Sequence, residues 1–137
     1  MKIFLDADLL VAVLNRQYPL FTYAAKILSL SEKPGYQLYT SPICLAIAFY
    51  FAEKKSGTQQ AKQKIATLSK HIQVTSVDAE TVKFAVQNVA VNEFEDGLEY
   101  YSTVGSNCKV IITEDTSDFY FSEIPVYNSE DFIGSLG

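Results

Sequence analysis

Residues 109–118, KVIITEDTSD, decide the fold, because an apolar, β-branched run ends abruptly in acidic and polar side chains. Residues 109–113 have the composition of a buried strand, and the polar turn EDTSD follows at once. Upstream, NEFE at 92–95 has the spacing of a capping box, which predicts a helix that begins there and runs through Tyr101. A helix that leads into a buried strand is the unit from which parallel sheets are built.

The same alternation extends over the rest of the chain. Strands are predicted at 2–5, 36–40, 71–75, 109–113 and 125–127. Helices are predicted over 8–15, over 21–28, from 42 to Gly57, from 58 through 68, after Asp78, from 92, and over 129–133. This order predicts an α/β fold with a mostly parallel sheet, helices on both of its faces, and the first strand in a central position.

Two helices carry specific predictions about burial. Ser41-Pro42 should open one of them, and its residues 43–52 are apolar on every side, which predicts a deeply buried helix. In the helix capped by Asp78, the apolar residues that predict a buried face are Val82, Ala85, Val86 and Val89.

Length and composition restrict the class of protein. The chain has 137 residues, which predicts a single domain over residues 1–137. Its net charge of −5 excludes a basic footprint over the whole domain, but not a metal-dependent nucleic-acid enzyme, whose site is itself acidic. No stretch has the composition of a membrane span, and the N-terminus lacks the apolar core of a signal peptide, so we expect a cytoplasmic protein.

Several kinds of site find no support in the sequence. The only histidine, His71, excludes a multi-histidine metal site, and Cys44 and Cys108 form no CxxC pair and are expected to be ordinary buried thiols. There is no GxxxxGK[ST] or GxGxxG loop and no Gly-x-Ser-x-Gly elbow.

Acidic side chains collect where the strands are expected to end. They are Asp6 after the first strand, Glu114, Asp115 and Asp118 after the 109–113 strand, and Glu93, Glu95 and Asp96 in the first turn of the helix from residue 92. Ligands of parallel sheets bind beyond the carboxyl ends of the strands. Oxygen ligands without His or Cys favour Mg²⁺ or Mn²⁺, which can activate water for phosphodiester hydrolysis.

These acids also have ordinary structural explanations. Acidic residues in a first helical turn complement the helix dipole, and an Asp after a strand often forms a turn or caps a helix. Asp6 is less easily explained in this way, because an unpaired charge at the end of a central strand is costly.

Four stretches together resemble the PIN domain, the nuclease domain of VapC-type toxins. They are KIFLDADLLVAVL at the N-terminus, TSPICLAIAFYFAEKK from residue 40, NEFEDGLEYYSTVGSNCKVIITEDTSDF from residue 92, and PVYNSEDFIGSL from residue 125. The resemblance covers nearly the whole chain, and residues 93–119 are its most specific part. It implies a three-layer α/β/α fold and a Mg²⁺- or Mn²⁺-dependent ribonuclease site.

The resemblance also assigns residues to that site. It implies catalytic, metal-binding roles for Asp6, Asp96 and Asp115, with Glu93 and Asp118 as supporting metal ligands. It further implies an RNA substrate, a cognate antitoxin protein and a homodimer.

One position departs from the family pattern. The second acid of the family is a Glu near the start of the helix after Ser41, where this chain has Ile47 or, in a shifted alignment, Ala46. Glu53 lies about 9 Å further along the helix and is not expected to reach the site.

These features leave two main hypotheses. The first is a PIN-domain endoribonuclease, the toxin of a toxin–antitoxin pair, with Arg16, Lys54 and Lys55 as candidate RNA contacts. The second is a degenerate, non-catalytic PIN domain that binds RNA or protein, which the missing Glu favours. A response-regulator-like domain is a third and weaker alternative, because 109–113 is followed by acids and not by a Lys.

Overall fold

The computed structural model describes residues 1–136. The strands are β1 (Lys2–Leu5), β2 (Gln37–Thr40), β3 (Gln73–Val74), β4 (Val110–Ile112) and β5 (Val126–Tyr127). The α-helices are α1 (Ala7–Asn15), α2 (Leu20–Ser29), α3 (Pro42–Ser56), α4 (Thr58–Leu68), α5 (Ala79–Gln87), α6 (Phe94–Gly105) and α7 (Ser129–Ser135). Short 3₁₀ turns occupy Leu30–Glu32 and Thr116–Phe119. Each predicted strand and helix is present, with ends shifted by a few residues.

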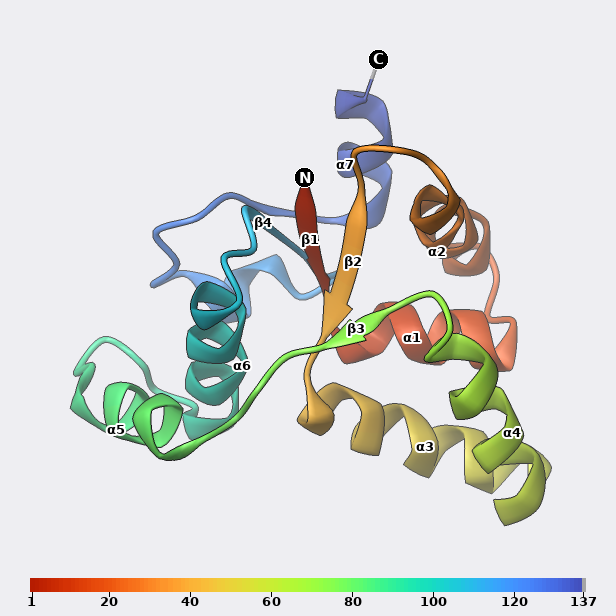
Figure 1. Cartoon of the computed structure of the whole chain (residues 1–137), viewed down its shortest axis with the longest axis horizontal. Helices are drawn as coiled ribbons and strands as arrows, with labels where there is room; N and C mark the ends of the chain where they lie inside the picture. Colours follow the sequence, from red (N-terminus) through yellow and green to blue (C-terminus); the bar gives the residue numbers. More distant parts are fainter. Residues whose placement is uncertain (137) are drawn as a thin grey trace.

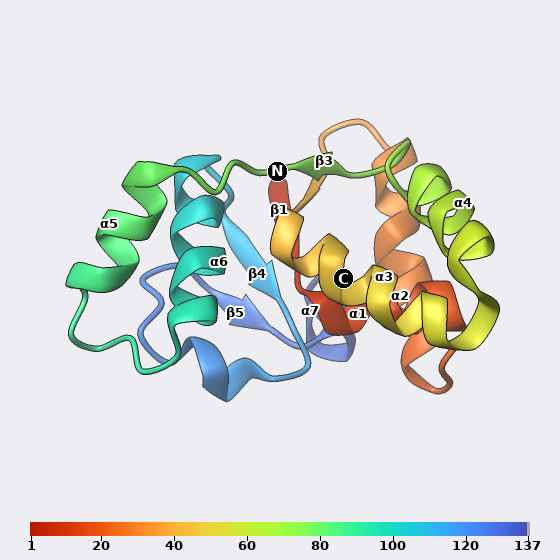
Figure 2. The same cartoon turned by 90° about the horizontal axis from the view of Figure 1, so that it is seen from below.

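The five strands form one parallel sheet in the order β3-β2-β1-β4-β5 (Figure 1). Strand β1 lies in the middle and pairs with β2 on one side and β4 on the other, as its apolar sequence predicts. Figure 2 shows α5 and α6 on one side of the strands and α2 and α4 on the other. The structure therefore confirms the α/β/α fold class, and the sheet is parallel throughout.

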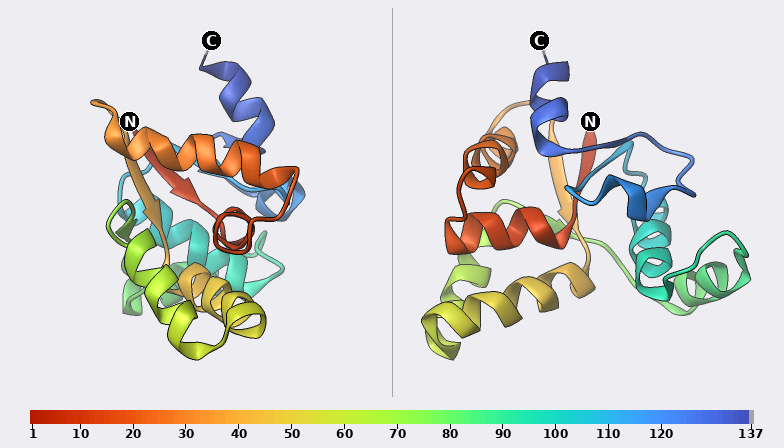
Figure 3. Two further views of the ribbon diagram at one scale, coloured as in Figure 1. Left: turned by 90° about the vertical axis from the view of Figure 1, so that its right-hand side faces the viewer. Right: turned by 180° about the vertical axis from the view of Figure 1, so that it is seen from behind.

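The core gathers around the three central strands. Ile3, Phe4 and Leu5 of β1 and Ile111 and Ile112 of β4 are all buried. Because both faces of these strands are covered, their apolar side chains do not alternate with polar ones. The side and rear views in Figure 3 show α1 running directly on from β1. Asp6 connects the two elements at the carboxyl end of the central strand.

Helix α3 differs from the prediction of deep burial. Its ends are as expected, since the Ser41 hydroxyl accepts from the Cys44 N–H at 3.0 Å and the helix ends before Gly57. Only Cys44, Ala48 and Ala52 are buried, however, whereas the ring of Tyr50 is half exposed. The buried positions of α3 are thus small side chains spaced four residues apart, Leu45 and Ile47 are partly buried against the core, and Phe51 is exposed like Tyr50.

The predictions for α5 and the start of α6 were also partly wrong. Asp78 caps α5 through the Thr81 N–H, but the buried residues of α5 are Thr81 and Ala85, and Val86 and Val89 are exposed. At α6 the expected capping box does not form, because Glu93 is the N-cap and makes no side-chain cap hydrogen bond. Within residues 1–136, no helix is long and apolar enough to cross a membrane.

Candidate functional site

A cleft of about 400 Å³ lies beyond the carboxyl ends of β1 and β4. Its acidic lining consists of Asp6, Asp8, Glu95, Asp96, Glu99, Asp115 and Asp118. Its other lining residues are Ala7, Val11, Gln17, Leu20, Ile47 and Phe51. Among residues 1–136, those that line the cleft include no Lys, Arg or His, so its carboxylates face one another without a cationic partner.

Asp6 is held in the middle of this cleft. As the N-cap of α1, it accepts the Ala7 N–H at 2.7 Å through Oδ1. The buried Thr113 hydroxyl, directly after β4, donates to Oδ2 at 2.8 Å. Two neighbouring elements therefore fix the carboxylate, and the pairing of β1 with β4 brings them together.

Asp8 has a bracing role beside it. Its Oδ2 accepts the Glu114 N–H at 2.7 Å and its Oδ1 accepts the Leu9 N–H at 2.8 Å, so it ties α1 to the turn after β4. Burial, and then the charge of Asp6, raise the pKa of Asp8 to about 7. Sequence reasoning did not select Asp8, although it stands two residues after Asp6.

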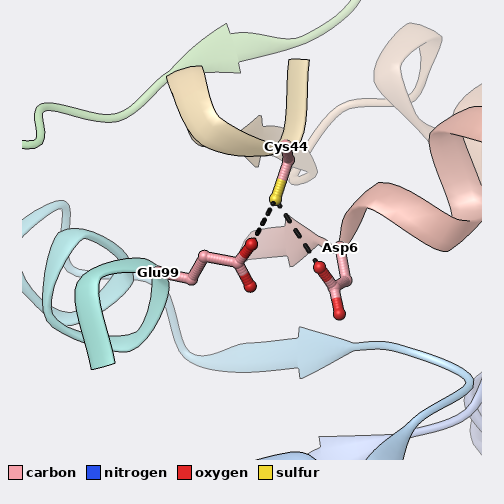
Figure 4. Close-up of side chains that lie close together, drawn as sticks. All are labelled: Asp6, Cys44 and Glu99. Carbon is pink, nitrogen blue, oxygen red and sulfur yellow. Dashed lines mark hydrogen bonds between the residues drawn. The ribbon is translucent and has the colours of Figure 1, made fainter. Parts of the chain in front are cut away.

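Glu99 enters the cleft from α6 and was also missed. Its side chain is only 2% exposed, and Cys44 Sγ lies 3.3 Å from its Oε1 and 3.6 Å from Oδ1 of Asp6 (Figure 4). Burial, and then the negative charge of Asp6, raise the pKa of Glu99 to about 9. The spacing of three residues from Asp96 places both acids on one face of α6 and was the available signal.

The other acids selected from the sequence take different positions. Asp96, Asp115 and Asp118 line the cleft with Asp6, whereas Glu93 is exposed at the N-cap of α6 and is not among the lining residues. Burial, followed by the charge of Asp118, raises the pKa of Asp96 to about 6 and also raises the pKa of Asp115. The structure thus brings four of the five selected side chains to one cleft.

The tightest cluster differs from the one expected. Within the described part of the chain, the group of three potential ligand atoms that lie within 4.8 Å of one another belongs to Asp6, Cys44 and Glu99. Burial raises the pKa of the Cys44 thiol well above its usual value, so this sulfur is a protonated donor. Cys44 is thus a buried free thiol, as expected, and it lies against two acids of the cleft.

The cleft also has an apolar wall. Ile47 and Phe51 of α3 line it together with Val11 and Leu20. Ile47 therefore stands near the acids, as its alignment with the missing Glu requires, and α3 supplies no carboxylate there. Glu53 lies outside the lining and accepts from the Thr58 hydroxyl at 2.7 Å.

The donor set fits a divalent cation bound through oxygen. Several carboxyl groups converge without a basic neighbour, and their raised pKa values show that burial and mutual repulsion oppose their ionisation. A cation among them would offset both effects, and oxygen-only donors suit Mg²⁺ or Mn²⁺.

Comparisons with solved structures identify similar folds at low sequence identity. VapBC2 from Rickettsia felis, bound to a promoter DNA fragment, matches with a TM-score of 0.73 and 15% identity over 93% of this chain and 98% of that one. VapBC-1 from nontypeable Haemophilus influenzae matches with a TM-score of 0.71 and 16% identity over 95% and 99%. VapC20 from Mycobacterium tuberculosis, a toxin that cleaves the sarcin–ricin loop, matches with a TM-score of 0.66 and 20% identity over 89% and 98%.

Sequence comparison agrees with this fold. A search of curated proteins finds no significant match. The family model of the PIN domain matches residues 2–117, which include the strands β1 to β4 and each acidic residue of the cleft except Asp118. The chain therefore belongs to the PIN domain family, and its fold resembles that of VapC toxins from toxin–antitoxin systems.

Proposed function

We propose that this chain is a single-domain, Mg²⁺- or Mn²⁺-dependent endoribonuclease and the toxin of a type II toxin–antitoxin pair. The observation that supports the proposal most strongly is the cleft of converging carboxylates, which has no basic side chain in its lining. Membership of the PIN domain family and the likeness to VapC folds support the same function.

In this proposal Asp6, Asp96 and Asp115 hold the cation, with Asp118 beside them. When bound, such an ion supplies an activated water and neutralises charge on the RNA phosphate. Thr113 fixes the orientation of Asp6 by its hydrogen bond, and Asp8 braces the turn that carries Asp115. Glu93, which is exposed at the N-cap, acts only through its charge, as one of the groups that raise the pKa of Asp96.

RNA would be held against the apolar wall. Phe51 is 43% exposed beside the cleft, and an aromatic face of this kind can stack on an unpaired base. The three basic residues selected from the sequence are not among the lining residues. Lys54 stands over the Tyr50 ring at 4.8 Å, and Lys55 donates to the Asn15 carbonyl. Single-stranded RNA is the substrate that this surface favours.

The charge of the cleft and the exposed apolar side chains support two kinds of protein partner. An antitoxin with a basic segment would complement the acidic cleft, and a homodimer would cover exposed apolar side chains. On α3 and α5, those outside the cleft include Tyr50, Val82, Phe84 and Val86. The VapBC assemblies among the similar structures agree with an antitoxin partner.

The proposal is tested by cleavage of single-stranded RNA during a Mn²⁺ titration. We expect weak cleavage that increases with Mn²⁺ from micromolar to millimolar concentrations and stops on addition of EDTA. Asp96→Asn should cut at least about tenfold more slowly, because the substitution removes one negative ligand. Equal rates for the wild type and the variant would contradict the assigned site.

The second candidate function is a PIN domain that binds RNA or protein without cutting it. The observation that favours it is Ile47, an apolar side chain in the wall of the cleft. In the same titration this candidate predicts no metal-dependent cleavage by the wild type, although RNA binding, measured by fluorescence anisotropy, persists.

A further inference from the structure

We propose that Glu99 is the second acid of this site, and that it reaches the cation from α6 because α3 offers no carboxylate in the cleft. The inference rests on the proposed metal-binding function and deepens it. Glu99 lies in the middle of α6, one turn after Asp96, and would be a ligand of the cation. Cys44 would be a positioning residue that orients the Glu99 carboxylate.

The first argument is distance. The ligand atoms of Asp6, Cys44 and Glu99 all lie within 4.8 Å of one another. Two oxygen atoms bound to one Mg²⁺ or Mn²⁺ are at most about 4–5 Å apart, because each metal–oxygen bond measures about 2.0–2.6 Å. Figure 4 shows the carboxyl groups of Glu99 and Asp6 side by side beneath the Cys44 sulfur.

The second argument is burial without a charged partner. Glu99 is 2% exposed, and the groups that act most strongly on its carboxyl are Asp6, Cys44 and Asp96. A buried carboxylate is costly unless it is paired with a cation. A cation bound between Glu99 and Asp6 would offset that cost, so the burial of Glu99 beside a second acid favours a cation at this position.

The third argument is that the side chains of α3 in the cleft are not cation ligands, whereas α6 contributes carboxylates. Helix α3 contributes Ile47 and Phe51 to the cleft, and neither side chain can bind a cation. The group of α3 that does reach Asp6 is the Cys44 thiol, which is a poor ligand for Mg²⁺ or Mn²⁺. Cys44 instead donates toward Oε1 of Glu99 and so orients the carboxylate that replaces the missing one.

The test measures Mn²⁺ affinity by isothermal titration calorimetry, without RNA. Glu99→Gln, which keeps the shape and the hydrogen-bonding capacity of the side chain, should raise the Kd for Mn²⁺ at least about tenfold. Glu123→Gln is the matched control, because it removes the same charge from an exposed site outside the cleft, and its Kd should stay that of the wild type. Glu99→Asp, which keeps the charge on a shorter side chain, should lie between Glu99→Gln and the wild type.

A rescue variant separates ligation from packing. Ile47→Glu, introduced into Glu99→Gln, returns a carboxylate to the cleft from α3 and should recover most of the lost Mn²⁺ affinity. A structural role of Glu99 predicts no such recovery. If Glu99→Gln fails to fold by circular dichroism, Glu99→Asp decides the question, and a wild-type Kd for Mn²⁺ in that folded variant overturns the inference.

The outcomes distinguish this inference from the function on which it rests. If the wild type binds no Mn²⁺ at millimolar concentration, the metal-dependent function and the inference both fail. If the wild type binds Mn²⁺ and Asp6→Asn does not, while a folded Glu99→Gln binds like the wild type, the function stands and the role of Glu99 is refuted.

Discussion

Replacing Asp6 by Asn should lower the rate of Mn²⁺-dependent RNA cleavage by about 100-fold or more, the largest loss expected from any single substitution in the cleft. Asp6 lies at the end of the central strand, and its charge contributes to the raised pKa values of Asp8, Glu99, Asp96 and Asp115. A group that interacts with four other acids of the cleft is the one on which a shared cation depends most.

The variant should keep its fold. The amide oxygen of Asn can still accept the Ala7 N–H, and loss of the charge relieves repulsion among the remaining acids. Initial rates of cleavage at saturating Mn²⁺ measure the effect, with Glu123→Gln as the control that should keep the wild-type rate. A folded Asp6→Asn protein that retains more than about half of the activity would show that the reaction occurs elsewhere.

The second large effect concerns stability and pH in the absence of metal. The pKa of Glu99 is raised from 4.5 to about 9 on folding, so the folded protein binds a proton that the unfolded chain releases. The associated stability is fully present below pH 4.5 and is lost as the pH rises toward 9. The contribution of Glu99 to the free energy of unfolding should therefore fall by up to about 1.4 kcal/mol per pH unit in this range.

Glu99→Gln should remove this slope, because the amide does not titrate. Urea unfolding at about pH 5 and about pH 8 should show the variant gaining stability relative to the wild type as the pH rises. Asp8 and Asp96, whose pKa values are also raised, add slopes of the same sign that remain in the variant. Saturating Mn²⁺ should restore the stability that the wild type loses at high pH. If the free energies of unfolding of the wild type and Glu99→Gln differ by the same amount at both pH values, the assigned environment of Glu99 is wrong.

Most of the fold could be predicted from local sequence patterns. The apolar runs before Asp6 and Glu114 are long enough to specify buried parallel strands, and Ser41 and Asp78 cap their helices as their residue types predict. The burial of α3 could not be predicted in the same way. An all-apolar helix does not reveal which face its neighbours cover, and here the small residues Ala48 and Ala52 form the contact face.

The site was predicted only where its residues stand at the ends of elements. Asp6, Asp96, Asp115 and Asp118 follow strands or begin a helical turn, and the carboxyl-end rule of parallel sheets brings them together. Glu99 lies within a helix, where an isolated glutamate is usually a solvent-exposed residue. Its position against Asp6 depends on where α6 lies relative to the end of β1, which is a tertiary property. Glu93 was selected as an acid of the first turn of this helix, but it stands at the N-cap, outside the cleft lining.

The central claim, that this cleft binds a divalent cation through its carboxylates, is tested most directly by a crystal soaked in Mn²⁺ and measured for anomalous scattering. The account predicts an anomalous peak within about 2.0–2.6 Å of carboxylate oxygens of Asp6 and Glu99, with Asp96 or Asp115 completing the site directly or through water. A well-ordered cleft without such a peak at millimolar Mn²⁺, or a peak bound only outside it, would contradict the account.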